Sequence, residues 1–214
     1  RFAKFGLPVS TVRSPYGLAE ATVYVVASPG GRAPTEVRFD SEKLAAGHAA
    51  LCADGGSELV GVGTPRSCDV LIVDAETLLE LPAGEVGEIW VHGDQVAAGY
   101  WRNPELTART FGGQLAAAAE GTPKGPWLKT GDLGVIFDGE LFIIGRIKDL
   151  LIVDGRNHYP DDIEVTIGEI TAGRVAAVSV QDETTEKLVA IAEIKPPGGT
   201  PEEAAGKLRD LRRR

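Results

Sequence analysis

Methionine is absent from this chain of 214 residues, and cysteine, histidine and aromatic residues are scarce. Cys52 and Cys68 have the spacing of neither a zinc ribbon nor a redox pair, so we predict two free thiols. No apolar run approaches the roughly 20 residues that a membrane-spanning helix requires. We therefore expect a cytoplasmic protein without a membrane span. Because even the first residue is not methionine, we expect the chain to be a segment of a longer gene product.

An excess of acidic residues gives the chain a formal net charge of -9. Such a body repels polyanions, which argues against nucleic acid and anionic membranes as partners. Hydrophobic residues make up 43% of the sequence, enough for a soluble globular protein with a sizeable core. Any anionic ligand must then be held by a few local groups rather than by the overall charge.

Short apolar segments separated by Gly, Pro and Asp turns dominate residues 60–147 and predict a small distorted β-barrel or sandwich. Within it, Asp138-Gly139 has the backbone freedom for a tight hairpin turn. Asn103-Pro104 predicts the start of a helix, with Asn as N-cap and Pro at the first helical position. Residues 28–58 have few such segments and predict a long surface excursion, with a short strand at 37–39 and weak helical character after Ser41.

The residues after Lys148 predict a small unit of helix, two strands and a second helix. The first helix begins near Tyr159-Pro160, the strands lie at 175–180 and 188–194, and the second helix begins at Pro201. The sequence as a whole therefore predicts an α+β protein with two domains, 1–147 and 148–214.

Four local clusters could carry chemistry, and the first is YGLAEAT at residues 16–22. The ring of Tyr16 can stack on a purine, Gly17 lets the backbone approach it, and the carboxylate of Glu20 can bind Mg²⁺ among phosphates. An ordinary β-turn with a buried tyrosine explains the same residues. Taken alone, this cluster is a weak indication.

The second cluster is GEVGEIWVHG at residues 84–93, followed by Gly99-Tyr100-Trp101. Its glycines indicate tight corners at strand ends, and its functional content is low. His92 is better explained as a packed or solvated residue at a strand end than as a general base.

The third and fourth clusters are LKTGDLG at residues 128–134 and GRIKDLLIVDG at residues 145–155. The carboxylate of Asp132 can accept hydrogen bonds from the two hydroxyls of a ribose. The guanidinium of Arg146 stays charged and can bind ribose or phosphate oxygens. A Gly-Asp turn and a surface Arg-Asp pair are the simpler alternatives.

In this order, the four clusters resemble the consecutive core motifs of the acyl-adenylate-forming superfamily. YGLAEAT and the segment GRNHYPDDIE at residues 155–164 are similar to fatty acyl-AMP ligases rather than to acyl-CoA synthetases. The resemblance is strongest to ligases that activate long, meromycolate-type chains for a polyketide synthase. It implies that 1–147 is the end of a large adenylation domain, with an insertion at 28–58 that hampers the use of CoA, and that 148–214 is an incomplete C-terminal domain.

Carried over by position, the resemblance implies that Tyr16 and Gly17 border the adenine and that Glu20 holds the Mg²⁺ bound to ATP. Asp132 would bind the ribose hydroxyls, with Arg146 beside the ribose and phosphate. Lys148 would be the hinge on which the C-terminal domain pivots. The implied substrates are ATP and a fatty acid, the product is acyl-AMP, and the acceptor is an acyl carrier protein or the carrier domain of a polyketide synthase.

Two parts of the family pattern are not found in this sequence. A phosphate-binding loop is expected before Arg1 and a catalytic lysine after Arg214, so no catalytic residue is assigned and the segment alone is expected to be inactive. Many relatives also have Thr at the position of Ala19, which removes one hydroxyl contact to the α-phosphate. An acyl-CoA synthetase, a non-catalytic nucleotide-binding module and a carrier-docking module remain as alternatives.

Overall fold

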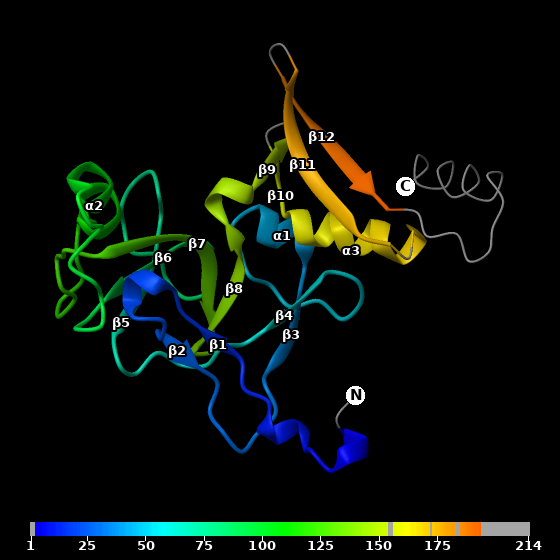
Figure 1. Ribbon diagram of the computed structural model, residues 1–214, viewed down its shortest axis with the longest axis horizontal. Coiled ribbons are helices and arrows are strands. Elements are labelled where there is room, and N and C mark those ends of the chain that lie inside the picture. The colour runs from blue at the N-terminus through cyan, green and yellow to red at the C-terminus, as the bar shows by residue number, and fades with distance from the viewer. Residues whose placement is uncertain (1–2, 154–155, 172, 183–184, 194–214) are drawn as a thin grey trace. The chain divides into compact units, whose positions relative to one another are not determined.

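A computed structural model describes residues 3–153, 156–171, 173–182 and 185–193 (Figure 1). The chain divides into two compact units, residues 1–148 and 149–214. This division lies one residue beyond the domain boundary that we expected from the sequence. The short 3-10 helix η4 (Ile147–Asp149) spans it.

The first unit is organised around a four-stranded antiparallel sheet in the order β5-β6-β7-β8. The strands are β5 (Asp69–Val73), β6 (Gly87–His92), β7 (Leu128–Phe137) and β8 (Glu140–Arg146). Strands that follow one another in the sequence are neighbours in the sheet, which is the common arrangement. The predicted hairpin is confirmed, since Phe137 pairs with Glu140 and both Asp138 (φ 48°) and Gly139 (φ 75°) take the positive angles that a tight primed turn requires.

This sheet is open rather than closed into the expected small barrel. Within the part of the chain that the structure describes, no pairing joins β5 to β8. The other edge of β8 instead receives residues 61–63, where Val62 N–H donates to Leu141 O at 2.9 Å and Leu141 N–H donates to Gly63 O at 3.0 Å. The α+β class is confirmed.

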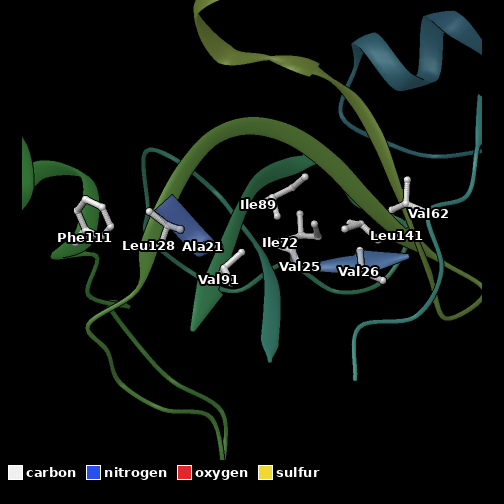
Figure 2. Packing of buried hydrophobic residues seen from close by; sticks show 10 residues of the cluster. All are labelled: Ala21, Val25, Val26, Val62, Ile72, Ile89, Val91, Phe111, Leu128 and Leu141. Atoms are coloured by element: carbon white, nitrogen blue, oxygen red, sulfur yellow. The ribbon is translucent and has the colours of Figure 1, made fainter. Parts of the chain in front are cut away.

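The main hydrophobic core lies against this sheet and includes residues from the segment around the first cluster (Figure 2). Ala21, Val25 and Val26 pack there beside Ile89 of β6 and Leu141 of β8, and all five are at most 2% exposed. Strands β1 (Pro15–Tyr16) and β2 (Val26–Ala27) pair on either side of the 3-10 helix η3 (Ala19–Ala21). The burial of these small residues therefore joins the first cluster to the sheet.

A second apolar cluster consists of Val73, Trp90 and Trp127, each at most 1% exposed. The Nζ atom of Lys129 lies 5.6 Å from the centroid of the Trp90 ring, within the range of a cation–π contact. Helix α2 (Pro104–Phe111) precedes Trp127 in the sequence. It begins as predicted, with the Asn103 side chain accepting a hydrogen bond from Leu106 N–H at 3.1 Å.

Residues 28–58 lie largely at the surface and contain the predicted short strand and helix, and they are anchored to the sheet. Strand β3 (Glu36–Phe39) pairs with β4 (Ser57–Val60), and the short helix α1 (Ser41–Ala45) lies between them. Phe39 is fully buried, with its ring 5.2 Å from Phe137 and 5.5 Å from Phe142 in edge-to-face geometry. The Arg32 guanidinium also lies 2.6 Å from the carboxylate of Glu140.

Among its described residues, the second unit contains two antiparallel strand pairs and one helix. Strands β9 (Leu151–Val153) and β10 (Arg156–His158) pair with each other, and helix α3 (Pro160–Thr171) follows. Strands β11 (Val175–Asp182) and β12 (Thr185–Ala192) form the second pair. The predicted helix and two strands are confirmed, β10 is an additional strand, and the helix expected from Pro201 lies outside the described residues.

The burial of Phe39 gives a test of how residues 28–58 are anchored. We expect Phe39→Ala to lower the free energy of unfolding by about 3–5 kcal/mol, because it deletes a buried ring and leaves a cavity. Val60→Ala on β4 is the control, since Val60 is 42% exposed, and a surface change of this kind costs within about 0.5 kcal/mol. Urea unfolding followed by tryptophan fluorescence measures both, and equal losses would contradict anchoring through Phe39.

Candidate functional site

The Tyr16–Thr22 turn places an aromatic ring and a carboxylate on one tightly folded segment. Tyr16 is in β1 and Glu20 is in η3. A Cβ added at Gly17 would lie 1.6 Å from the carbonyl oxygen of Val23, so no larger residue fits where the chain folds back on itself. Gly17 is therefore required by the turn itself, whatever else it contacts.

The Asp132 carboxylate of β7 lies between two of the other predicted site residues. The Tyr16 hydroxyl donates a hydrogen bond to Asp132 Oδ2 at 2.8 Å, and Arg146 Nε lies 3.4 Å from Asp132 Oδ1. Asp132 and Arg146 are also direct partners in the pairing of β7 with β8. The structure thus brings together Tyr16, Asp132 and Arg146 from β1, β7 and β8.

Exposure differs sharply across this cluster. The Asp132 side chain is 14% exposed, whereas that of Arg146 is 60% exposed. Burial, with a further contribution from the Asp132 charge, raises the pKa of the Tyr16 hydroxyl well above its usual range. The phenol therefore keeps its proton at neutral pH and stays a hydrogen-bond donor to the carboxylate.

Glu20 is held by a residue that the sequence did not single out. The Tyr100 hydroxyl donates to Glu20 Oε1 at 2.5 Å, and this hydrogen bond is the main reason that the pKa of Tyr100 is raised. Tyr100 is itself positioned by α2, because its N–H donates to Thr107 Oγ1 at 2.9 Å and its ring packs edge-to-face on Phe111 at 5.2 Å. The one signal in the sequence was its place in Gly99-Tyr100-Trp101, since Tyr100 lies three residues before the predicted N-cap Asn103.

The backbone that carries Asp132 is held by side chains. Gly131 has a φ of 74°, which a glycine adopts readily. Thr130 Oγ1 donates to Ile89 O at 2.7 Å and accepts from Asp132 N–H at 3.1 Å. Gly131 N–H donates to Glu88 Oε1 at 3.0 Å. Sequence reasoning missed Glu88, although a charged residue in an otherwise apolar strand segment could have indicated it.

Lys148, the predicted hinge residue, is exposed and lies in η4, immediately before the division between the two units. Its hinge role stays a prediction.

The predictions for His92 and for the two cysteines agree with the structure. His92 Nδ1 lies 3.0 Å from Pro126 O, and its ring packs on Trp127 with a centroid distance of 5.3 Å. This agrees with the view of His92 as a packed residue at a strand end. Cys52 and Cys68 are free thiols, as predicted.

The described residues contain neither a metal-binding group nor a membrane-spanning helix. No three or more His, Cys, Asp or Glu side chains gather there as a metal-binding group would require. No helix in those ranges has both the length and the apolar character needed to span a membrane.

Comparison with known proteins identifies relatives over the whole chain. Residues 2–101 match the family of AMP-binding enzymes. The chain is 60% identical to the long-chain-fatty-acid–AMP ligase FadD26 of Mycobacterium marinum, an alignment that covers 100% of this chain and 37% of that protein. It is 57% identical to a 4-hydroxyphenylalkanoate adenylyltransferase of Mycobacterium tuberculosis, covering 100% of this chain and 35% of that protein. The chain thus spans little more than a third of the length of these relatives.

A solved structure supports the same relationship. The fatty acyl-adenylate ligase of Legionella pneumophila, determined in complex with acyl adenylate and pyrophosphate, is 33% identical with a TM-score of 0.65. That match covers 98% of this chain and 37% of the other. Since the sequence relatives match all of this chain and the structural match covers nearly all of it, the chain is similar over its length to part of the fatty acyl-AMP ligases, and residues 2–101 match the family of AMP-binding enzymes.

Proposed function

We propose that this chain is the adenosine-binding part of an ATP-dependent ligase that joins a long-chain fatty acid to AMP and releases pyrophosphate. The observation that carries the proposal is the Asp132 carboxylate, held between the Tyr16 hydroxyl and the Arg146 guanidinium. Tyr16, 116 residues earlier in the sequence, and Arg146, on the paired strand β8, converge on this one group, which is an arrangement expected of a binding site rather than of a simple turn.

Asp132 is suited to bind the ribose. A carboxylate can accept about four hydrogen bonds, so the two contacts to Tyr16 and Arg146 leave it able to accept from the ribose hydroxyls. At 14% exposure it is partly shielded from water, which strengthens such charged hydrogen bonds. Arg146, with most of its side chain exposed, can reach the ribose and the phosphate oxygens.

Glu20 fits Mg²⁺ bound to the phosphates of ATP. In nucleotide sites this ion typically takes one or two carboxylates and completes its shell with phosphate oxygens and water. A single carboxylate oriented by the Tyr100 hydroxyl meets that requirement. When bound, the ion neutralises phosphate charge, while Tyr100 and α2 hold Glu20 in place.

The chemistry attributed to this chain is therefore positioning and charge balance. The fatty carboxylate would attack the α-phosphorus of ATP with pyrophosphate as leaving group, and fixed donors and charges lower the barrier to such a transfer. Tyr16 and Gly17 would border the adenine, and Lys148 would serve as the hinge for a later domain movement.

The acyl group would then pass to a carrier protein or to the carrier domain of a polyketide synthase. Residues 28–58, anchored through Phe39, are the expected insertion that disfavours CoA. Magnesium dependence, a role in mycolic-type lipid synthesis and a cytoplasmic location belong to the same proposal. Two free thiols are compatible with a reducing compartment.

A second candidate differs in the acid rather than in the reaction. The 57% identity to a 4-hydroxyphenylalkanoate adenylyltransferase is close to the identity with FadD26. An aromatic alkanoic acid is therefore the alternative substrate for the same AMP-forming step.

Asp132 supplies the first test of the proposed reaction. In the complete gene product, we expect Asp132→Asn to lower kcat/KM for ATP by about a hundredfold, because charged hydrogen bonds to the ribose are lost. ATP–pyrophosphate exchange measures this. Asp138→Asn makes the same change in the exposed turn between β7 and β8 and should leave exchange within about twofold of the wild type. Equal effects of the two variants would reject the ribose assignment.

The Glu20–Tyr100 pair supplies a second test. We expect Glu20→Gln to raise the Mg²⁺ concentration for half-maximal exchange by about a hundredfold, and Tyr100→Phe to raise it by about tenfold, since it removes a group that orients a ligand. Tyr24→Phe is the matched control, because the Tyr24 side chain is exposed. An unchanged Mg²⁺ requirement in Glu20→Gln would exclude it as the ligand.

The product distinguishes the ligase from its alternatives. With ATP, Mg²⁺, palmitate and CoA, we expect the complete gene product to accumulate acyl-AMP without acyl-CoA, as mass spectrometry of the products would show. Replacing palmitate by a 4-hydroxyphenylalkanoic acid should lower the rate by about tenfold or more if the pocket takes alkyl chains. Formation of acyl-CoA would favour the synthetase alternative, and a preference for the aromatic acid would favour the second candidate.

A further inference from the structure

Glu88 is a carboxylate inside the sheet, with only 5% of the residue exposed. Its Oε2 accepts a hydrogen bond from the indole N–H of Trp90 at 2.8 Å, and its Oε1 accepts one from the backbone N–H of Gly131 at 3.0 Å. An ionised group taken out of water is tolerated only where such donors replace the lost hydration. The carboxylate is therefore tied to two groups, one of them in the segment that carries Asp132.

The contact to Gly131 occurs where the β-ladder is interrupted. Pairing of β6 with β7 runs through Glu88 with Leu133 and resumes at Trp90 with Lys129. One residue of β6 thus faces three residues of β7, 130–132. Such an irregularity takes backbone groups out of the regular ladder.

Side chains provide the missing hydrogen bonds at this irregularity. Glu88 accepts from Gly131 N–H, while Thr130 bonds both Ile89 O and Asp132 N–H. Gly131, at φ 74°, turns the chain between these two contacts. Asp132 follows directly, with its carboxylate against Tyr16 and Arg146.

From this geometry we propose that Glu88 is a positioning residue of the adenosine site, whose buried carboxylate holds Gly131 N–H and so directs Asp132 toward the ribose hydroxyls. The inference rests on the proposed function of Asp132. Glu88 itself contacts backbone and indole, so its effect is exerted through the turn.

A purely structural role for Glu88 predicts a different outcome. Substitution of Glu88 would then lower the stability of the protein and leave its preference for ATP over 2′,3′-dideoxy-ATP intact. A positioning role predicts loss of the part of the affinity that depends on the ribose hydroxyls. The ratio of the dissociation constants of 2′,3′-dideoxy-ATP and ATP isolates that part, because the two ligands differ only in those hydroxyls.

The variant Glu88→Gln keeps the size of the side chain but leaves one oxygen to serve two N–H donors. We expect the complete wild-type protein to bind ATP at least about tenfold more tightly than 2′,3′-dideoxy-ATP, as the loss of charged hydrogen bonds implies. In Glu88→Gln that ratio should fall to within about threefold of one. Isothermal titration calorimetry gives the ratio, and the Tm of each variant is recorded alongside.

Trp90→Phe is the matched control. It removes the other donor and part of a buried ring, so it lowers Tm, but it leaves the Glu88–Gly131 contact in place and should keep the wild-type ratio. The double variant Glu88→Gln with Trp90→Phe should regain the ratio, because the amide oxygen can then face Gly131 N–H while the amide nitrogen no longer meets an indole N–H.

Each outcome decides one claim. A wild-type ratio near one overturns the ribose assignment, and this inference with it. If the wild-type protein prefers ATP and Glu88→Gln keeps the same ratio, this inference alone is overturned. Should Glu88→Gln fail to fold, the double variant is compared with Glu88→Leu in the Trp90→Phe background, which has no acceptor for Gly131. The inference requires that the Glu88→Gln, Trp90→Phe variant keeps the wild-type ratio of dissociation constants and that the Glu88→Leu, Trp90→Phe variant loses it. Equal ratios in the two variants overturn the inference.

Discussion

The pairing of β7 with a strand on each side is the constraint on which the rest of the first unit depends. Its partners β6 and β8 hold it in the interior of the sheet, so the irregularity at residues 130–132 cannot relax by fraying into solvent. Gly134 shows how closely the strands approach, because a Cβ there would lie 2.8 Å from the Ile89 side chain and from Phe142 O. Asp132 is therefore presented by backbone that is fixed on both sides.

The proposed adenosine site depends on that fixed strand because Tyr16, which contacts Asp132, comes from a distant part of the sequence. Tyr16 is 116 residues before Asp132 in the sequence and reaches it with one hydrogen bond. The phenol is neutral at physiological pH, and burial raises its pKa further, so Tyr16 donates a hydrogen bond to the carboxylate as a neutral group. The core residues around Ala21 and Val25 hold the segment that carries Tyr16 against the sheet, and this keeps the Tyr16 hydroxyl within hydrogen-bond distance of Asp132 (Figure 2).

Glu20 and residues 28–58 are likewise positioned by side chains from other parts of the fold. Glu20 is oriented by Tyr100, which in turn depends on Thr107 and Phe111 of α2. The excursion is joined to the sheet by the buried ring of Phe39 rather than by surface contacts alone. In both cases a side chain outside the predicted site residues decides where a segment lies.

Local physical chemistry made much of this protein readable from its sequence. The Asp138-Gly139 turn, the Asn103 cap and the short apolar strands follow from φ preferences and hydrogen bonds between near neighbours, and the structure has them where they were predicted. The order of the four clusters indicated the family, and residue type together with that resemblance pointed to Asp132 and Arg146.

Only the tertiary structure decided which groups meet. The openness of the sheet, the burial of Phe39, the role of Tyr100 beside Glu20 and the acceptor role of Glu88 all depend on residues distant in sequence coming into contact. The free energy of such contacts comes from desolvation and from the pairing of buried polar groups, and neither quantity is set by a residue's neighbours along the chain. The sequence by itself determined what each site residue can do, and the folded chain determined what each one touches.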